Sequence, residues 1–529
     1  MISRRTVLNS GLVATLASGL PAAAQTTRPA PARSLDDLVL ATMKAFQVPG
    51  LAVCVVETGK ETVARGYGVR SLARGGNVDE RTVFPIGSNA KAFTAAALAL
   101  LVDEKRIGWD DPVIKHMPSF RMYEDYATRE LSIRDLLCHR SGLGLGQGDL
   151  MFWPRTDFTR PEIVERLRYL KPARSFRSGY AYDNLLYIVA GELIPAITGQ
   201  SWEAFVAERL LRPLGMADSA PGAEAVTSAN HASGHARLGG PLRGVGGRMQ
   251  PVREPSMTSV VNPSGGIHST ARDMSRWIRA QLDRGKLENG AQLWSSKVAG
   301  DMWRGQTIMG ASPAKQNTEV SPHFALYALG WGLQDYRGVP ILTHTGGLAG
   351  FVSRTLLVPS RGFGVAILTN AEEEGAHTAL YRMLLDRHLG AEPVDWIGLG
   401  AKEDAETKAE LLKEVEQARD AAAGTPKLTL PLASYAGRYR DPWYGDVVIG
   451  RDRSGLTIDF TRTPALKGRL EPVGPDKFRT RFPSPEAEDA YLQFKLGANG
   501  AIEEVTLGAV SPFADFSFDY GDLLLRPVA

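Results

Sequence analysis

The sequence predicts an α+β fold, in which an antiparallel sheet closed by both ends of its domain packs with a helical cluster, followed by a small all-β barrel. Strand-like runs stand near both ends of the first domain and helix-like segments lie between them, which favours one sheet built from both ends. After Leu428 the composition changes to short alternating runs separated by Gly, Asp and Pro, a pattern typical of a barrel. We therefore expect a first domain over residues 35–395 and a second over 429–529.

The first 24 residues have the three parts of a secretory signal peptide. Arg4 and Arg5 precede an apolar stretch, and Ala22–Ala24 offers a small-residue cleavage site. Ser3–Leu8 resembles the twin-arginine export signal of bacteria, which predicts a periplasmic protein; a Sec signal with a chance arginine pair is the alternative. No later segment reaches the roughly 18 apolar residues of a spanning helix, so we expect no stable membrane insertion. Residues 25–34 are expected to be a linker.

The elements of the first domain follow from its hydrophobic patterns. A helix over about 34–46 leads into two strands, 50–57 and 61–68, that form a hairpin. A helix-rich middle contains a helix at Ser88, one near 132–138 and a long one from about Asn184. Strands then return, at 339–344, 353–359 and 363–369. A charged, alanine-rich helix within 396–428 is expected to connect this domain to the barrel.

Composition argues against several classes of function. The 529 residues carry a formal net charge of +3, and removal of Arg4 and Arg5 with the leader reduces it by two to +1, so nothing favours a nucleic-acid partner. Cys54 and Cys138 lie in apolar stretches and are predicted to be buried thiols. The chain has no CxxC, Cys/His or HExxH spacing, so we expect no metal and no cofactor.

The most informative motif is Ser88-Asn89-Ala90-Lys91, which stands just before an alanine-rich helical run. Residues three apart on an α-helix are neighbours, so the Lys91 amine can reach the Ser88 hydroxyl. A lysine whose pKa is lowered by burial can take the serine proton, and a helix N-terminus offers backbone N–H groups to an oxyanion. A second S-x-x-K copy, Ser312–Lys315, contains a proline and has no helical run behind it, so it is predicted to be a loop.

Two further motifs supply the other groups that an acyl-transfer site needs. Tyr182-Asp183-Asn184 precedes the long helix, where a phenol can relay a proton and an amide can hold the Lys91 amine. His344-Thr345-Gly346-Gly347 ends a strand, and its glycines let backbone approach a scissile bond. A strand N–H at this point, together with the N–H of Ser88, would form an oxyanion hole with two donors.

The order S-x-x-K, Y-x-N and H-x-G resembles the serine β-lactamase and penicillin-recognising superfamily in its class C-like branch. The likeness runs from about residue 34 to 390 and includes three supporting stretches, Leu136–Leu143, Leu210–Met216 and Gly265–Met274. It implies a β-lactamase/transpeptidase-like fold. It also implies a role for each motif residue: Ser88 as nucleophile, Lys91 and Tyr182 as base and proton relay, Asn184 as orienting amide, His344 in the third motif, and Gly347 as the second oxyanion donor.

Two positions depart from the class C pattern. His344 stands where those enzymes carry the lysine of K-T-G, and histidine, unlike lysine, is neutral for much of the time near pH 7. The H-x-G motif is instead similar to that of D-aminopeptidases, D-stereospecific peptidases and family esterases. Asp183 occupies a position that is usually small or uncharged. We expect its carboxylate to be solvated, because Asp is seldom buried without a partner; an inward Asp183 would raise the Lys91 pKa.

These features predict a periplasmic serine hydrolase that acts through a Ser88 acyl-enzyme on short or linear peptides, including peptides with D-residues. The alternatives are a carboxylesterase, a β-lactamase or D,D-carboxypeptidase, and a lactam- or peptidoglycan-binding sensor that acylates without turnover. Tyr435–Tyr439 resembles the start of the lipocalin-like module of some peptidases in this group. Such modules cap the cleft or pack between subunits, which leaves a homo-oligomer open. His139 is expected to make a structural hydrogen bond outside the site.

Overall fold

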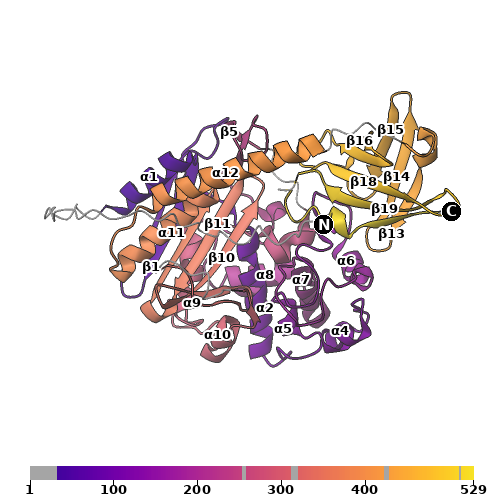
Figure 1. Cartoon of the computed structure of the whole chain (residues 1–529). Helices are drawn as coiled ribbons and strands as arrows, with labels where there is room; N and C mark the ends of the chain where they lie inside the picture. The colour runs from indigo at the N-terminus through magenta and orange to yellow at the C-terminus, as the bar shows by residue number, and fades with distance from the viewer. Residues whose placement is uncertain (1–32, 253–257, 311–319, 422–427, 512–513, 529) are drawn as a thin grey trace.

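The computed structural model describes residues 33–252, 258–310, 320–421, 428–511 and 514–528. The predicted signal peptide, most of the predicted linker, the second S-x-x-K copy and the segment 422–427 of the predicted connector lie outside these described residues. A first domain and a C-terminal barrel domain are joined by the long helix α12 (Trp396–Ala421), as Figure 1 shows. No helix within the described ranges is both long enough and apolar enough to cross a membrane.

The first domain is built on an antiparallel sheet to which both of its ends contribute. β1 pairs with β12 from Leu51 to Glu57, so the N-terminal hairpin lies against the last strand of the domain, as the sequence predicts. Within the described residues the sheet has eight strands. Their spatial order is β2 (Val63–Gly68), β1 (Gly50–Glu57), β12 (Phe363–Thr369), β11 (Phe351–Val358), β10 (Val339–Leu348), β9 (Gly332–Tyr336), β8 (Ala325–Tyr327) and β7 (Thr307–Ile308).

Helices cover both faces of this sheet, and alternate residues of β1 enter different cores. Leu51 and Val53 pack in a core with α1 (Leu35–Phe46) and α11 (Glu374–Leu389), whereas Ala52, Cys54 and Val56 pack in the larger core with α2 (Ala90–Asp103) and α9 (Ala271–Leu282). Cys54 and Cys138 are both buried free thiols, as predicted. Figure 1 shows α1, α11 and α12 on one side of the sheet and α2 and α9 on the other.

The central helix α2 is buried from Ala90 to Leu101. The backbone at Gly330 packs directly against this alanine-rich helix. A Cβ built on Gly330 would lie only 2.8 Å from the Lys91 carbonyl oxygen, so this close approach requires glycine. The surrounding helices are α3 (Val113–His116), α4 (Asp125–Glu130), α5 (Ile133–Leu136), α6 (Arg160–Arg166), α7 (Leu185–Thr198), α8 (Trp202–Val206) and α10 (Ser296–Trp303). Two small sheets complete the domain, β3 (Phe84–Pro85) with β6 (His268–Ser269) and β4 (His235–Leu238) with β5 (Arg248–Pro251).

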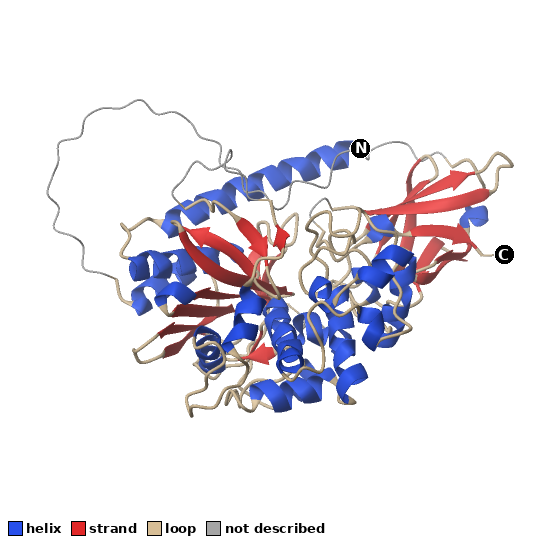
Figure 2. Cartoon of the chain, turned by 90° about the horizontal axis from the view of Figure 1, so that it is seen from below, coloured by secondary structure: helices blue, strands red, loops and turns tan. Residues whose placement is uncertain are grey.

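The barrel domain confirms the predicted all-β architecture. Its interior is apolar because inward residues alternate with outward ones, as at Val447, Ile449 and Leu456. Figure 2 shows the strands of the two domains as separate groups with helices between them. In the described part of the chain the closed barrel has eight antiparallel strands: β13 (Gly437–Asp441), β14 (Gly445–Asp452), β15 (Gly455–Phe460), β16 (Lys467–Gly474), β17 (Lys477–Arg481), β18 (Ala490–Leu496), β19 (Ile502–Ala509) and β20 (Leu524–Pro527).

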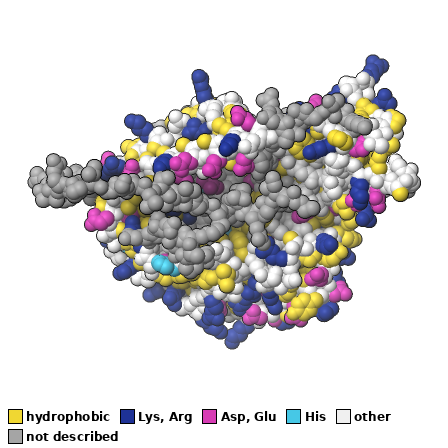
Figure 3. All heavy atoms as spheres, in the orientation of Figure 1, with side chains coloured by type: hydrophobic (Ala, Val, Ile, Leu, Met, Phe, Trp, Pro, Cys, Tyr) yellow, Lys and Arg dark blue, Asp and Glu magenta, His cyan; other side chains and the backbone are white. Residues whose placement is uncertain are grey.

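The two domains touch through polar and aromatic contacts. Arg462 of the barrel hydrogen-bonds Asp157, and its guanidinium lies 3.9 Å from the centre of the Phe158 ring. Arg166 donates to the Trp443 carbonyl at 2.9 Å. On the face that Figure 3 shows, basic and acidic side chains are interspersed over both domains. The barrel is therefore packed against the first domain.

Candidate active site

Ser88 lies in a 3-10 turn, Gly87–Asn89, that leads directly into α2. The turn packs against β10, and a Cβ built on Gly87 would lie 3.0 Å from the backbone nitrogen of Gly347. Gly87 also has a φ of 51°, which favours glycine. The half-buried serine is therefore held between the start of the helix and the strand that carries the third motif.

Lys91 is fully buried one helical turn beyond Ser88. Its Nζ contacts three oxygen atoms: Ser88 Oγ at 3.1 Å, Asn184 Oδ1 at 2.7 Å and the Ser264 carbonyl at 2.9 Å. Burial lowers the pKa of Lys91 from 10.5 to about 7, against the opposing effect of two nearby carboxyl groups. A neutral amine has two N–H groups, which Asn184 and Ser264 accept, so its lone pair is left facing Ser88.

Tyr182 and Asn184 come from the segment that opens α7. The centre of the Tyr182 ring lies 4.8 Å from Lys91 Nζ. Burial raises the pKa of the Tyr182 hydroxyl well above 10.0, while its hydrogen bond with the Ser88 side chain acts in the opposite direction, so the phenol is neutral and can donate a proton. Asn184 donates from Nδ2 to Asp149 Oδ2 at 2.8 Å, which turns its amide oxygen toward Lys91.

His344 and Gly347 lie on β10 at the same site. His344 Nδ1 pairs with the Thr345 carbonyl at 2.6 Å, and Nε2 pairs with the Tyr327 hydroxyl at 2.7 Å. Because a carbonyl only accepts, Nδ1 carries the proton and Nε2 accepts from Tyr327. Burial lowers the pKa of His344 to about 3, so the imidazole is neutral. Gly347 is exposed and its nitrogen lies close to the turn of Ser88, where the predicted second oxyanion donor would have to be.

The expectation of a solvated Asp183 is wrong. Asp183 is 1% exposed, and its Oδ1 accepts from the backbone N–H of Leu186 at 3.2 Å, which is one of the unpaired donors at the start of α7. Ser141 donates to its Oδ2 at 3.4 Å. An Asp two residues before the first residue of α7, and three before the N–H that it accepts from, was the signal for this buried position. Burial raises the pKa of Asp183 to about 6, and its negative charge raises the pKa of Lys91.

Sequence reasoning missed Asp149 and the barrel segment that reaches it. Asp149 is fully buried, and its Oδ2 accepts from Asn184 and, at 2.8 Å, from Ser517 Oγ of the barrel domain. Asp519 of the same segment accepts from the backbone N–H of Gly148 at 2.8 Å. The apolar run that follows Asp149 indicates a buried segment. No local pattern, however, links Asp149 to Ser517, which lies 368 positions further along the chain.

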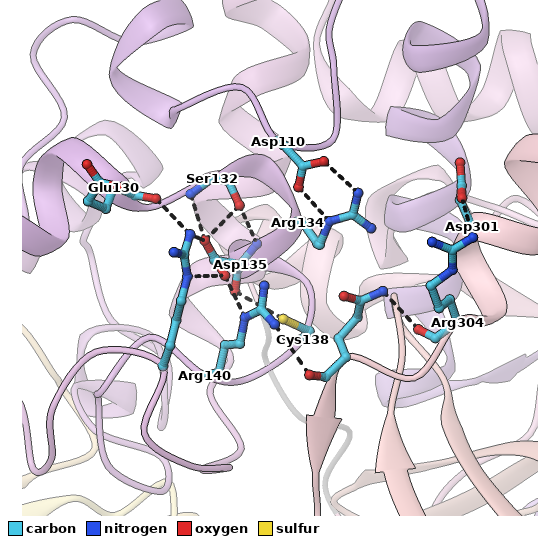
Figure 4. Close-up of polar contacts among 11 residues, drawn as sticks. Asp110, Glu130, Ser132, Arg134, Asp135, Cys138, Arg140, Asp301 and Arg304 are labelled. Carbon is cyan, nitrogen blue, oxygen red and sulfur yellow. Dashed lines mark hydrogen bonds and ion pairs between the residues drawn. The ribbon is translucent and has the colours of Figure 1, made fainter.

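His139 makes the predicted structural hydrogen bond, since its Nδ1 accepts from the backbone N–H of Asp183 at 3.1 Å. Its ring centre lies 4.4 Å from that of Tyr182, so the turn it occupies supports the phenol. The buried Asp135 anchors this turn. It accepts from Arg140 at 2.6 Å and from the backbone N–H of Ser132, the N-cap residue of α5, as Figure 4 shows.

The chain carries the sequence signature of a known family over most of its length. Residues 35–387 match the family model described as Beta-lactamase. The chain belongs to the beta-lactamase family. Two matched relatives are described as hydrolases, which together with the family match confirms the predicted superfamily and the prediction of a serine hydrolase. Residues 421–527 match a second model, described as Domain of unknown function (DUF3471).

Relatives and solved structures are similar to this beta-lactamase-family chain over 65% to 89% of its length. Unguisins hydrolase ungD' of Aspergillus campestris is 30% identical over 490 residues, which cover 88% of this chain and 87% of that protein. Protein flp of Staphylococcus aureus is 26% identical over 65% of this chain and 64% of its own length. The octameric penicillin-binding protein homologue from Pyrococcus abyssi has a TM-score of 0.57 at 20% identity, covering 89% of this chain and 97% of its own. A class C beta-lactamase mutant has a TM-score of 0.52 at 20% identity, and the match covers 70% of this chain and 96% of that protein.

Proposed function

We propose that this chain is a periplasmic peptidase that cleaves amide bonds of short or linear peptides through a Ser88 acyl-enzyme. The observation that carries the proposal is the set of contacts of Lys91. Two oxygen acceptors hold two of its protons, and Ser88 Oγ stands 3.1 Å away in the remaining direction. With a pKa lowered by burial to about 7, the amine is free for proton transfer near neutral pH.

In the proposed reaction Ser88 Oγ attacks the carbonyl carbon of the substrate while its proton passes to Lys91 Nζ. The C–O bond forms, the carbonyl electron pair moves to oxygen, and the N–H groups of Ser88 and Gly347 receive the oxyanion. The Tyr182 hydroxyl gives its proton to the leaving nitrogen as the C–N bond breaks, and the Lys91 ammonium restores that proton. Water then adds to the acyl-enzyme by the reverse sequence and releases the acid.

The state of His344 favours a peptidase or esterase over a β-lactamase or D,D-carboxypeptidase. Both of its ring nitrogens are engaged by protein groups, and burial keeps the ring neutral. The third motif therefore offers no cation to a substrate carboxylate, which the lysine of class C enzymes would supply. A hydrolase named for unguisins among the relatives supports a hydrolytic reaction rather than a sensor that stops at the acylated state.

The exported location and the assembly state are parts of the same proposal. The twin-arginine pattern around Arg4 and Arg5 supports export to the periplasm, which cell fractionation of the full-length chain would test. A homo-oligomer is supported by the octameric structural neighbour, and sedimentation of the mature protein would measure it. A monomer at micromolar concentration would overturn that part alone.

The decisive experiment is a substrate panel on the mature protein and two serine variants. L- and D-aminoacyl p-nitroanilides, p-nitrophenyl esters and a chromogenic cephalosporin separate peptidase, esterase and β-lactamase activities. Ser88→Ala should lower every activity by about 10⁴-fold or more, as expected for a lost nucleophile. Ser312→Ala, in the second S-x-x-K copy, is the matched control and should retain activity. Residual turnover of Ser88→Ala within a few-fold of the parent would overturn the acyl-enzyme, and ester turnover without amide turnover would make the chain an esterase.

A further inference from the structure

The carboxyl group of Asp149 connects the two domains at the site. Its Oδ2 accepts from Asn184 Nδ2 and from Ser517 Oγ, each at 2.8 Å, while among the described residues its buried Oδ1 has no hydrogen-bond partner. A buried carboxyl that spends both of its hydrogen bonds on one oxygen is costly, so its position calls for an explanation beyond the stability of a loop.

The bond to Asp149 decides which end of the Asn184 amide faces Lys91. An amide has an accepting oxygen and a donating nitrogen, and a lysine amine needs the oxygen. Because Asp149 takes the Nδ2 protons, Asn184 Oδ1 is directed to Lys91 Nζ at 2.7 Å, the shortest of the three lysine contacts. Without an acceptor at residue 149 the amide could turn over and present its nitrogen to the base.

The barrel segment that carries Ser517 is fitted closely to this part of the first domain. Asp519 accepts from the backbone N–H of Gly148, and the Phe516 ring lies edge-on to Tyr182 with 6.1 Å between ring centres. A Cβ built on Gly146 would lie 2.5 Å from the Phe516 ring, so the two backbones meet only because this residue is glycine. Ser517 therefore reaches Asp149 as part of a packed contact.

The protonation states of the buried groups around Lys91 decide whether Asp149 acts on it through charge. In their ionised forms Asp149 and Asp183 would both raise the pKa of Lys91, against the larger effect of burial. The other titratable groups around these three include Tyr182 and Tyr187, whose ring centres lie within 5.3 Å of Lys91 Nζ, and His139, His344 and Asp519. Burial favours the neutral form of each of these phenols, imidazoles and carboxyls. It likewise raises the pKa of Asp149 well above 3.8, although the hydrogen bonds from Asn184 and Ser517 act in the opposite direction. Asp149 therefore acts on the base through the Asn184 amide rather than through a fixed charge.

We propose that Asp149 is a positioning residue for acylation, which orients Asn184 and holds the Lys91 base, and that Ser517 makes the barrel domain part of the same hydrogen-bond chain. The inference rests on the proposed function, because it concerns the base of that reaction. Removal of the Asp149 acceptor should let the Asn184 amide turn and misplace the Lys91 amine, which lowers kcat. Removal of the Ser517 donor should act in the same direction but less, because Asp149 keeps its bond to Asn184.

The test is the kcat and KM of the variants for an ester substrate, with the pH dependence of kcat/KM as a second readout, because its acid limb reports the base of the free enzyme. Asp149→Asn keeps an acceptor and the shape of the side chain, so its kcat and its acid limb should stay close to those of the parent. Ser517→Ala should lower kcat by about threefold with little change in KM. Ser454→Ala is the matched control, because Ser454 is an exposed barrel serine that also donates to a carboxylate, at 2.7 Å, away from the site. Its profile should coincide with that of the parent.

Asp149→Ala removes the acceptor, and kcat should fall by about tenfold or more below that of Asp149→Asn with little change in KM. Unfolding midpoints of all variants separate a folding defect from a catalytic one. A kcat of Asp149→Ala equal to that of Asp149→Asn overturns the role of Asp149, and an unchanged kcat in Ser517→Ala, or an equal loss in Ser454→Ala, overturns the role of the barrel. Activity that survives Ser88→Ala overturns the proposed function itself, which is a different result.

Discussion

Replacement of Lys91 by methionine measures how strongly burial opposes the charge of the amine. Burial brings the pKa of Lys91 from 10.5 to about 7, which corresponds to about 5 kcal/mol of opposition to the charged form. Between these two values the unfolded chain binds the extra proton and the folded chain does not. The free energy of unfolding of the parent therefore rises with pH by about 1.4 kcal/mol per unit, while Lys91→Met lacks this term. The advantage of the variant over the parent should be largest at and below pH 7 and shrink toward pH 10.5.

Methionine also leaves the Asn184 and Ser264 oxygens without their donor, at about 1–3 kcal/mol each, and this cost does not change with pH. The difference in unfolding free energy between variant and parent should thus fall by about 2 kcal/mol from pH 7 to pH 9, whatever its sign at the start. Urea denaturation at a series of pH values, followed by tryptophan fluorescence, measures it. Lys402→Met, at an exposed position of α12, is the control and should show a constant difference. A constant difference for Lys91→Met as well would refute the claim that this lysine is neutral when folded.

Three further outcomes are expected. The kcat/KM of the parent for an ester should rise with pH through a midpoint near pH 7 and lose its base below that value; a flat profile from pH 5 to 9 would contradict the assignment of Lys91. Asp135→Ala removes the buried acceptor of Arg140 and Arg177 and should lower the free energy of unfolding by about 3 kcal/mol in urea denaturation; a loss below about 1 kcal/mol would contradict it. Gly146→Ala should speed proteolysis between the domains, because its Cβ would meet the Phe516 ring at 2.5 Å; Gly59→Ala, with a similar positive φ and no neighbour within 4 Å, is the control, and equal cleavage rates would show backbone strain alone.

The parts of the fold and site that could be predicted are those that depend on local geometry. The spacing of Ser88 and Lys91 determines that the two side chains meet when the segment is helical, and their polar atoms do lie 3.1 Å apart. The alternation of the strand residues likewise predicts which side chains face each core. The closure of the sheet by β1 and β12 followed from strands at both ends of the domain, a topological rule rather than a local one.

The missed residues depend on contacts that no local pattern encodes. Asp183 was expected in solvent from the behaviour of isolated aspartates, but the start of α7 supplies it with a backbone donor and Ser141 supplies another. Asp149 and Ser517 meet only because the barrel packs against the first domain. They are 368 residues apart, so no pattern within either segment predicts their contact. Predictions from spacing therefore located the reacting groups and failed for the groups that support them.

The supporting carboxyls matter because burial alone would make the base too weak. The desolvation that lowers the pKa of Lys91 also raises the pKa of Asp183 to about 6, so amine and carboxyl titrate close together and near neutrality. Burial also raises the pKa of Asp149, and Ser517, itself only 8% exposed, is the barrel side chain that bonds and covers this carboxyl. In the proposed reaction the barrel thus contributes to the low dielectric that sets the base, in addition to any contact that it makes with substrate.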